Sequence, residues 1–475
     1  MKSLNHLICS RSSFFTLTHL SLFLGLGFAL TASANSRVGE LWNNNCLSCH
    51  GEKGEGGMAT SMLDDQWTYG SDADTMASVI RDGRLESGMP GYGEVLSDKE
   101  IRSLVIFINE QNAQAKPPMG PEPIGDEVYR SEKHDFRIET VVEDLDLPWS
   151  LAFFPDGNLL ISERPGTLLV VNPKSGHREA IAGIPEVYAR GQGGLLDVEV
   201  DPDYKKNGWI YLSFSDPGES GNESMTAIVR GRIRDGIWED EEQIFRAPGD
   251  AYTGRNVHFG CRLVFDGDYL FFTIGDRGRQ DDAQDLSVPN GKTHRIYKDG
   301  RIPADNPFVG KEGASPSIWT YGNRNAQGLA LDPKTGKLWE TEHGPRGGDE
   351  LNLIKKGRNY GWPIVTHGMN YNGTPITGKI SDPTMEDPVT YWTPSLAVCG
   401  LDVYHGSAFP KWDGALLSSA LRAQELRLII LSGESVSSQE VLVKDKGRIR
   451  DTVVGPDGLV YLILNSPNKI VKLVP

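Results

Sequence analysis

Two stretches near the N-terminus carry apolar side chains at helical spacing. Val38, Leu41 and Trp42 follow an i, i+3, i+4 pattern, which places them on one face of a helix. A second helix is predicted where Ser97 and Glu100 form a capping box ahead of an apolar run. Its apolar face carries Ile101, Leu104, Val105 and Ile108. These patterns predict a small all-α domain at the N-terminus.

From residue 131 onward, the pattern changes to short β-rich runs, most of them led by an Asp-Gly or Asn-Gly turn. Asp156-Gly157, for example, precedes an apolar run at 159–161. Six such units have their turn glycines at positions 157, 208, 267, 336, 414 and 458. Their irregular spacing fits repeats with inserted loops. The pattern favours an all-β six-bladed β-propeller, with an irregular β-sandwich as the alternative.

Residues 1–34 are predicted to be a secretory signal peptide. Lys2 and Arg11 give a positive start, the apolar run at 20–30 is too short to span a bilayer, and residues 32–34 form an A-x-A cleavage site. The alternative is an uncleaved membrane anchor. Since no other stretch approaches transmembrane length, the mature chain is expected to lack a membrane span and to be periplasmic or secreted.

A proline-rich stretch separates the two predicted domains. Residues 112–130 have little apolar periodicity and are expected to form a semi-rigid linker. The predicted organisation is an all-α domain at 35–111 and the propeller at 131–475.

The formal net charge of the chain is −16. A protein this acidic does not bind nucleic acid through a general electrostatic footprint. The charge favours a neutral substrate and, for electron transfer, a basic partner.

The sequence Cys46-Leu47-Ser48-Cys49-His50 matches the attachment motif of haem c. Two thiols add to the haem vinyl groups, and the histidine binds the iron. The alternatives are a redox dithiol, which does not need the histidine, and half of a zinc site, which lacks a second cysteine pair. The motif therefore predicts one covalent haem c on Cys46 and Cys49, with His50 as an iron ligand.

A second axial ligand is expected on the opposite side of the haem. Met89 lies in a turn-rich loop at 87–91, ahead of the second predicted helix. Residues 36–112 resemble small class I cytochromes c, and this resemblance supports Met89 as the ligand. Met89 could instead be a packing residue, in which case the ligand is one of three other methionines. These are Met58, Met62 and Met76.

Polar, glycine-rich loops recur along the predicted propeller. They lie at 191–196, 257–263, 275–278, 321–329, 340–352, 359–363 and 447–451. In this order they resemble the loops of the soluble quinoprotein glucose dehydrogenases, and most of all their aldose sugar dehydrogenase branch. The resemblance covers nearly all of residues 140–475. It implies a six-bladed propeller that oxidises aldoses with pyrroloquinoline quinone (PQQ) and calcium.

The resemblance also implies roles for individual residues. His258 matches the base that takes the hydroxyl proton, and Asp276 matches the acid that orients it; a lone histidine without the motif would more often be structural. Arg324 and Asn325 match a pair beside the quinone carbonyls. Further positions that line the cofactor or the substrate are Gln192, Tyr371, Arg422, Arg448 and Arg450. Arginine forks suit the carboxylates of PQQ, although any single arginine is more often a solvated surface charge.

Calcium prefers hard oxygen ligands, including backbone carbonyls. By resemblance, the carbonyls of Gly344 and Pro345 bind the ion that polarises the quinone. Glu350 and the carbonyl of Tyr360 match a second calcium site.

The expected activity is oxidation of an aldose at its C1 hydroxyl to the lactone. PQQ takes the hydride, the haem on the same chain takes electrons one at a time, and a downstream cytochrome or respiratory chain receives them. Two alternatives remain: a calcium-dependent lactone hydrolase, and a non-catalytic docking propeller that carries an electron-transfer haem.

Two further cysteines, Cys261 and Cys399, fall on loops expected at the same mouth of the propeller. In an oxidising compartment they can form a disulfide between distant blades. The alternative is a pair of buried free thiols.

Overall fold

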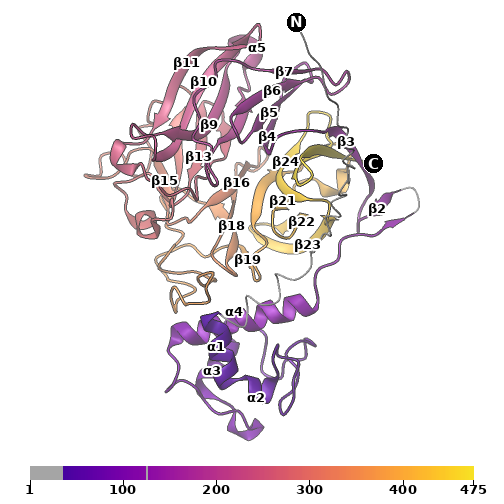
Figure 1. Cartoon of the computed structure of the whole chain (residues 1–475), viewed down its shortest axis with the longest axis vertical. Coiled ribbons are helices and arrows are strands. Elements are labelled where there is room, and N and C mark those ends of the chain that lie inside the picture. The colour runs from indigo at the N-terminus through magenta and orange to yellow at the C-terminus, as the bar shows by residue number, and fades with distance from the viewer. Residues whose placement is uncertain (1–35, 125–126) are drawn as a thin grey trace, which may run out of the picture.

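A computed structural model describes residues 36–124 and 127–475, which form a helical domain and a β-propeller (Figure 1). The expected signal peptide, residues 1–34, lies outside the described residues. The fold class predicted from the sequence is confirmed.

The helical domain spans residues 36–115 and contains both predicted helices. Its elements are α1 (Arg37–Asn45), α2 (Leu47–His50), α3 (Ala73–Asp82), a 3-10 turn (Leu85–Ser87) and α4 (Asp98–Ala115). The predicted capping box is present, because the Ser97 side chain accepts the Glu100 N–H while the Glu100 side chain accepts that of Ser97. Trp42 and Ile101 are buried in the same core, so the predicted apolar faces point inward.

The propeller consists of six antiparallel sheets. The first five sheets, in chain order, have four strands each. The first blade contains β4 (Pro148–Phe153), β5 (Leu159–Glu163), β6 (Thr167–Val171) and β7 (Arg178–Ala180), and the second contains β8 (Leu195–Val200), β9 (Ile210–Pro217), β10 (Ser224–Arg234) and β11 (Ile237–Arg246). The third blade contains β12 (Leu263–Asp266), β13 (Tyr269–Ile274), β14 (Lys292–Tyr297) and β15 (Ile318–Tyr321), the fourth contains β16 (Ala326–Leu331), β17 (Leu338–Glu342), β18 (Asp349–Ile354) and β19 (Thr390–Trp392), and the fifth contains β20 (Val398–Val403), β21 (Leu416–Ala420), β22 (Glu425–Ser432) and β23 (Ser435–Lys444). The sixth sheet comprises β24 (Arg448–Val454), β25 (Val460–Asn465), β26 (Lys469–Val474) and β3 (Asp135–Val142), extended by β1 (Pro123–Ile124) and β2 (Val128–Arg130). Short helical segments in the loops are α5 (Tyr204–Asn207) and 3-10 turns at Gly249–Ala251, Gln280–Gln284 and Pro410–Trp412.

The six turn glycines predicted from the sequence occupy equivalent places in the six blades. Each lies between the first and second strand of its blade. All six have a positive φ, from 58° at Gly267 to 87° at Gly157. Glycine adopts this conformation without the clash that a Cβ atom would cause. The repeat therefore reflects a turn geometry that each blade requires.

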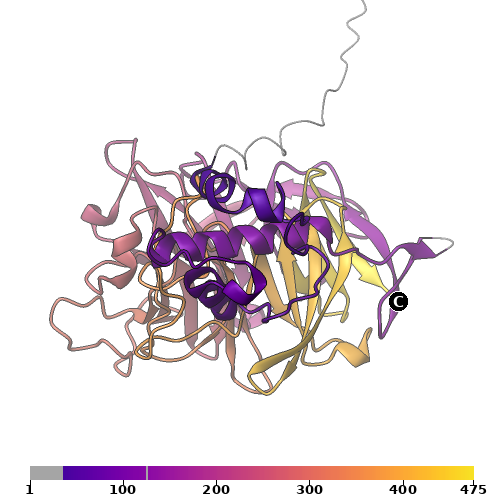
Figure 2. The ribbon, with the colours of Figure 1, turned by 90° about the horizontal axis from the view of Figure 1, so that it is seen from below.

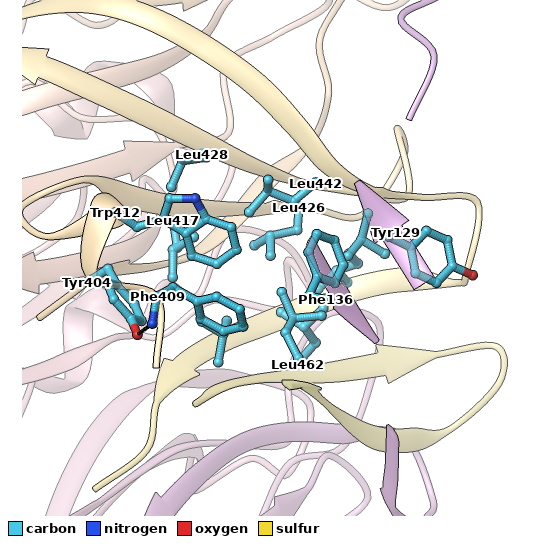
Figure 3. Packing of buried hydrophobic residues seen from close by; sticks show 14 of the residues in the cluster. Tyr129, Phe136, Tyr404, Phe409, Trp412, Leu417, Leu426, Leu428, Leu442 and Leu462 are labelled. Atoms are coloured by element: carbon cyan, nitrogen blue, oxygen red, sulfur yellow. Dashed lines mark hydrogen bonds between the residues drawn. The ribbon is translucent and has the colours of Figure 1, made fainter. Parts of the chain in front are cut away.

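The first and last strands of the propeller close the ring. β3 pairs with β26, and the register includes Ile138 opposite Leu473. Phe136 on β3 is fully buried against the aromatic residues of the fifth blade, with its ring centroid 6.2 Å from that of Trp412 (Figure 3). Burial of a side chain of this size contributes roughly 2–3 kcal/mol. Packing and backbone pairing thus join the two ends of the propeller chain.

Helix α4 runs between the rest of the helical domain and the propeller (Figures 1 and 2). The carboxylate of Glu110 on α4 accepts hydrogen bonds from Nε and Nη2 of Arg346 at 2.9 and 2.6 Å. Met369 of the propeller is fully buried in the core of the helical domain, where it packs with Trp42 and Phe107. An ion pair and an apolar anchor therefore dock the two domains.

Part of the range predicted as a linker is regular structure. α4 continues to Ala115, four residues past the predicted domain boundary at residue 111, since alanine at 113 and 115 favours helix. Residues 123–130 contribute the hairpin strands β1 and β2, which extend the sixth sheet.

Cys261 and Cys399 are both buried and free, so the structure contradicts the disulfide hypothesis. Cys261 packs in an apolar cluster between the second and third blades. The Cys399 sulfur instead lies among polar groups, 3.5 Å from Nη1 of Arg450. The two thiols occupy separate environments, and burial raises the pKa of Cys261.

Candidate active site

A histidine–carboxylate pair lies on two loops of the third blade. His258 precedes β12 and Asp276 follows β13, and Nδ1 of His258 lies 2.6 Å from Oδ1 of Asp276. Asp276 is buried, and its Oδ2 accepts a hydrogen bond from the Trp362 indole at 2.9 Å. The carboxylate is therefore fixed from two sides. This arrangement commits Nδ1 of His258 to Asp276 and leaves Nε2 for a reacting group.

Electrostatics favour the neutral form of His258. Burial lowers the pKa of His258, and the charge of Arg324 adds to this effect, while the hydrogen bond to Asp276 opposes it. Burial acts to raise the pKa of Asp276, but its contacts with His258 and Arg324 hold that pKa below its ordinary value. An ionised Asp276 beside a neutral His258 is the state expected of an oriented general base.

The surroundings of His258 fix its position. The side-chain oxygen of Gln192 accepts the His258 backbone N–H at 2.8 Å. His258 itself has a φ of 53°, a left-handed conformation that non-glycine residues seldom adopt. The side-chain oxygen of Asn325 accepts the Gly260 N–H at 3.2 Å, two residues farther along the same loop. Gln192 and Asn325 thus hold the loop that presents the histidine.

Arg324 connects the third blade with the loop between β17 and β18. Its Nη1 donates to the carbonyls of His343 and Gly344 at 2.9 and 2.8 Å. The guanidinium carbon lies 5.5 Å from the ring centroid of Trp362 and 6.0 Å from that of Tyr371. The structure therefore groups Arg324, Gly344 and Tyr371 with the His258–Asp276 pair.

Three arginines form a cationic cluster near the channel. Arg448 and Arg450 were predicted from the sequence, and Arg164 joins them in the structure. Within residues 36–124 and 127–475, none of the three forms an ion pair with a carboxylate, and the buried Nε of Arg450 has no hydrogen-bond partner. Burial and the charge of Arg450 lower the pKa of both Arg164 and Arg448. The charge of Asp146 opposes this effect at Arg164, whereas no carboxylate among the described residues does so at Arg448. The excess of positive charge fits a ligand with carboxylates.

A cavity of about 330 Å³ lies beside the loop that carries Gly344. Its walls include Gly344, Tyr371 and Arg422, and the Nη1 of Arg422 donates to the Ser395 carbonyl at 3.3 Å. His258 does not line this cavity. Arg324 lies between them, because it donates to the carbonyl of Gly344 on the cavity wall and its charge acts on His258. The structure thus brings the predicted Arg422 and Tyr371 to the Gly344 loop.

The predicted calcium ligands fall into two groups. The carbonyls of Gly344 and Pro345 accept hydrogen bonds from Arg324 Nη1 and from the Ser395 hydroxyl, each at 2.8 Å. Their oxygens can bind a cation in place of these donors. Glu350 lies on β18, and burial together with nearby carboxylates, Glu342 first among them, raises its pKa well above its usual value.

A cation would relieve the repulsion at Glu350. Tyr360, the other predicted ligand of the second calcium site, is buried in the loop that follows β18. The part of the chain that the structure describes holds no cluster of three or more His, Cys, Asp or Glu side chains placed to bind a metal ion. Any calcium at Gly344 and Pro345 would therefore rest largely on carbonyl oxygens.

The helical domain contains a second cavity, of about 350 Å³. His50 lines it, and the buried Nδ1 of His50 has no hydrogen-bond partner among the described residues. Cys46 and Cys49 are free thiols at the preceding turn. The methionines on its wall are Met58, Met62, Met76 and Met89. A cavity lined by a histidine and thioethers, with a free cysteine pair just before that histidine in the chain, fits haem c.

Three site residues were not singled out from the sequence. Trp362 lies in the glycine-rich loop at 359–363, and a tryptophan in a polar loop could have marked it. His343 lines the cavity, and its buried Nε2 has no partner among the described residues. Arg164 carries no local signal, because only the folded ring brings it near Arg450.

Fold and site together define a class of protein: a propeller oxidoreductase fused to a cytochrome-type domain. The chain belongs to the glucose/sorbosone dehydrogenase family, whose profile matches residues 145–472. The profile of the cbb3-type cytochrome c oxidase subunit III matches residues 33–108.

Known proteins resemble the propeller along most of their own length. Aldose sugar dehydrogenase YliI of Escherichia coli is 42% identical over 347 residues, which cover 71% of this chain and 92% of that protein. Quinoprotein glucose dehydrogenase B of Acinetobacter calcoaceticus is 30% identical over a region that covers 75% of this chain and 90% of that protein. The PQQ-bound structure of the aldose sugar dehydrogenase from Streptomyces coelicolor is 27% identical, with a TM-score of 0.59, and the match covers 71% of this chain and 98% of that one. Among the described residues, no helix combines the length and apolar character needed to cross a membrane.

Proposed function

We propose that this protein oxidises the C1 hydroxyl of an aldose to the lactone with PQQ, calcium and a covalent haem c. The observation that carries the proposal is the His258–Asp276 pair, at 2.6 Å, in a propeller that also brings Arg448 and Arg450 together. A quinoprotein among the relatives and a PQQ-bound relative support the choice of cofactor. When bound, PQQ supplies a two-electron acceptor for the hydride, and haem c carries electrons away singly.

The residues of the chain have separate tasks in this mechanism. The free Nε2 of His258 takes the hydroxyl proton, and Asp276 stabilises the imidazolium that forms. Arg324 holds the Gly344 loop and places positive charge near the reacting oxygen. Gln192 and Asn325 keep the base in position.

Other residues would hold the cofactors. Arg448, Arg450 and Arg422 would bind the PQQ carboxylates, with Tyr371 on the cavity wall. Gly344 and Pro345 would supply carbonyl oxygens to calcium, and Glu350 and Tyr360 would serve the second ion. In the helical domain, Cys46 and Cys49 would attach the haem, with His50 and Met89 as the iron ligands.

We also propose export to the periplasm or beyond, because residues 1–34 have the sequence features of a secretory signal peptide. The acidic net charge of −16 favours a basic protein as the downstream electron acceptor. Cell fractionation with an antibody against the chain tests the location, and recovery in the cytoplasm would contradict it.

The decisive experiment is an absorbance spectrum of the purified, haem-loaded protein with PQQ, calcium and an aldose. Reduction of the haem bands should require all three additions. The His258→Ala variant should bind PQQ but reduce the haem about 10²–10⁴ times more slowly. A second assay replaces the aldose with its lactone. A lactone hydrolase would release acid from the lactone and leave the haem oxidised with the aldose, and a docking propeller would act on neither compound, so either result would refute the proposal.

A further inference from the structure

Both domains line the cavity beside the Gly344 loop. From the propeller come Gly344, Tyr371 and Arg422; from the helical domain come Glu110 and Gln114. The last two are four residues apart on α4 and so share one face of the helix. We propose that α4 forms a wall of the quinone pocket and that Gln114 contacts the bound quinone. This inference rests on the proposed function.

An ion pair holds the wall in place. Glu110 is 4% exposed, and Arg346 donates to both of its carboxylate oxygens, with the shortest contact at 2.6 Å. A bidentate, charge-assisted contact of this kind is stronger than a neutral hydrogen bond. Arg346 directly follows Pro345, so the helical domain is fixed to the same loop that carries the proposed calcium ligands. The pair also neutralises Glu110 beside a pocket meant for an anion.

Close packing reinforces the ion pair. Ile106 lies so near Gly347 that a Cβ atom on Gly347 would be 2.7 Å from the Ile106 methyl group Cγ2. The backbone of Arg346 pairs with that of Met369 at 2.9 and 3.0 Å, and Met369 is buried in the helical domain. α4 cannot leave the loop without breaking the Glu110–Arg346 ion pair and exposing Met369. It is therefore a fixed part of the pocket.

Gln114 has the chemistry that a contact with the quinone needs. Its side chain is exposed at the cavity, while Glu110 is buried and occupied by Arg346. A primary amide can donate to the carboxylates of PQQ and accept from bound water. Gln114 faces the cavity that Arg422 lines, so the two side chains would share the anionic ligand.

The test measures PQQ affinity directly, by equilibrium dialysis of the full-length, haem-loaded protein with calcium. Gln114→Ala should weaken binding about five-fold through loss of one hydrogen bond. Gln114→Glu should weaken it at least about ten-fold, because it places a carboxylate against the carboxylates of the quinone. The matched controls are Gln243→Ala and Gln243→Glu, at an exposed glutamine on the outer strand β11. They should leave the affinity unchanged.

The outcomes separate this inference from the proposed function. A wild-type protein that does not bind PQQ overturns both. Tight wild-type binding with unchanged Kd in both Gln114 variants overturns the wall alone. An unchanged Kd with an altered KM for the sugar would place Gln114 against the substrate and also refute the quinone contact. Unchanged haem spectra and melting temperatures in the variants exclude misfolding.

Discussion

Gly347→Ala tests whether the two domains are docked as the structure describes. Gly347 has a φ of +84°, and an alanine Cβ there would lie 2.7 Å from Cγ2 of Ile106. The backbone strain costs about 1–2 kcal/mol. Overpacking against α4 adds about 1–3 kcal/mol. The expected loss of stability is therefore about 2–5 kcal/mol, and a displaced α4 should also weaken PQQ binding.

Gly414→Ala is the matched control. Gly414 has a φ of +79°, but an alanine Cβ there would have no atom within 4 Å, so this variant carries the strain without the collision. Urea unfolding followed by circular dichroism measures both variants, and haem absorbance reports the helical domain separately. Adding Ile106→Ala to Gly347→Ala should recover part of the loss. Equal destabilisation by the two glycine variants would refute the close approach of α4.

Three further measurements address the chemistry. The kcat/KM for the aldose should rise with pH as His258 loses its proton, with a midpoint below 6.5 because burial lowers the pKa of His258. Asp276→Asn removes the charge that raises this pKa and should move the midpoint lower still. A midpoint above 6.5 in the wild-type protein would contradict the assignment of His258 as the base. Met89→Ala should retain the covalent haem but lose the thioether–iron charge-transfer band, and its persistence would point to another methionine. Alkylation of the denatured, unreduced, haem-loaded protein should add two groups, at Cys261 and Cys399, whereas no addition would mean a disulfide.

Local signals in the sequence were sufficient for the architecture. The turn glycines could be predicted because each blade needs a left-handed residue at the same turn, and glycine marks such a position wherever it recurs. The capping box of α4 is equally local. The linker was predicted to begin at residue 112, but helix propensity continues through Ala113 and Ala115 until the proline-rich stretch begins.

Contacts between distant residues could not be predicted in this way. Glu110 and Arg346 carry no signal of their pairing, and each alone looks like a solvated surface charge. The same holds for Arg164, which reaches Arg450 only through closure of the ring. Cys261 and Cys399 were expected at one mouth of the channel, but the blade geometry gives one an apolar environment and the other a polar one.

The pairing of β3 with β26 has a consequence for the order in which the protein can assemble. β3 emerges from the ribosome early, and its partner is almost the last segment to be made. Until then one edge of β3 stays unpaired, although the β1–β2 hairpin can already cover the other edge. The helical domain and the first five blades have all their strands and helices before this point. The last few residues therefore close the ring by pairing with β3. A chain that stops before residue 469 leaves an open ring with an exposed strand edge.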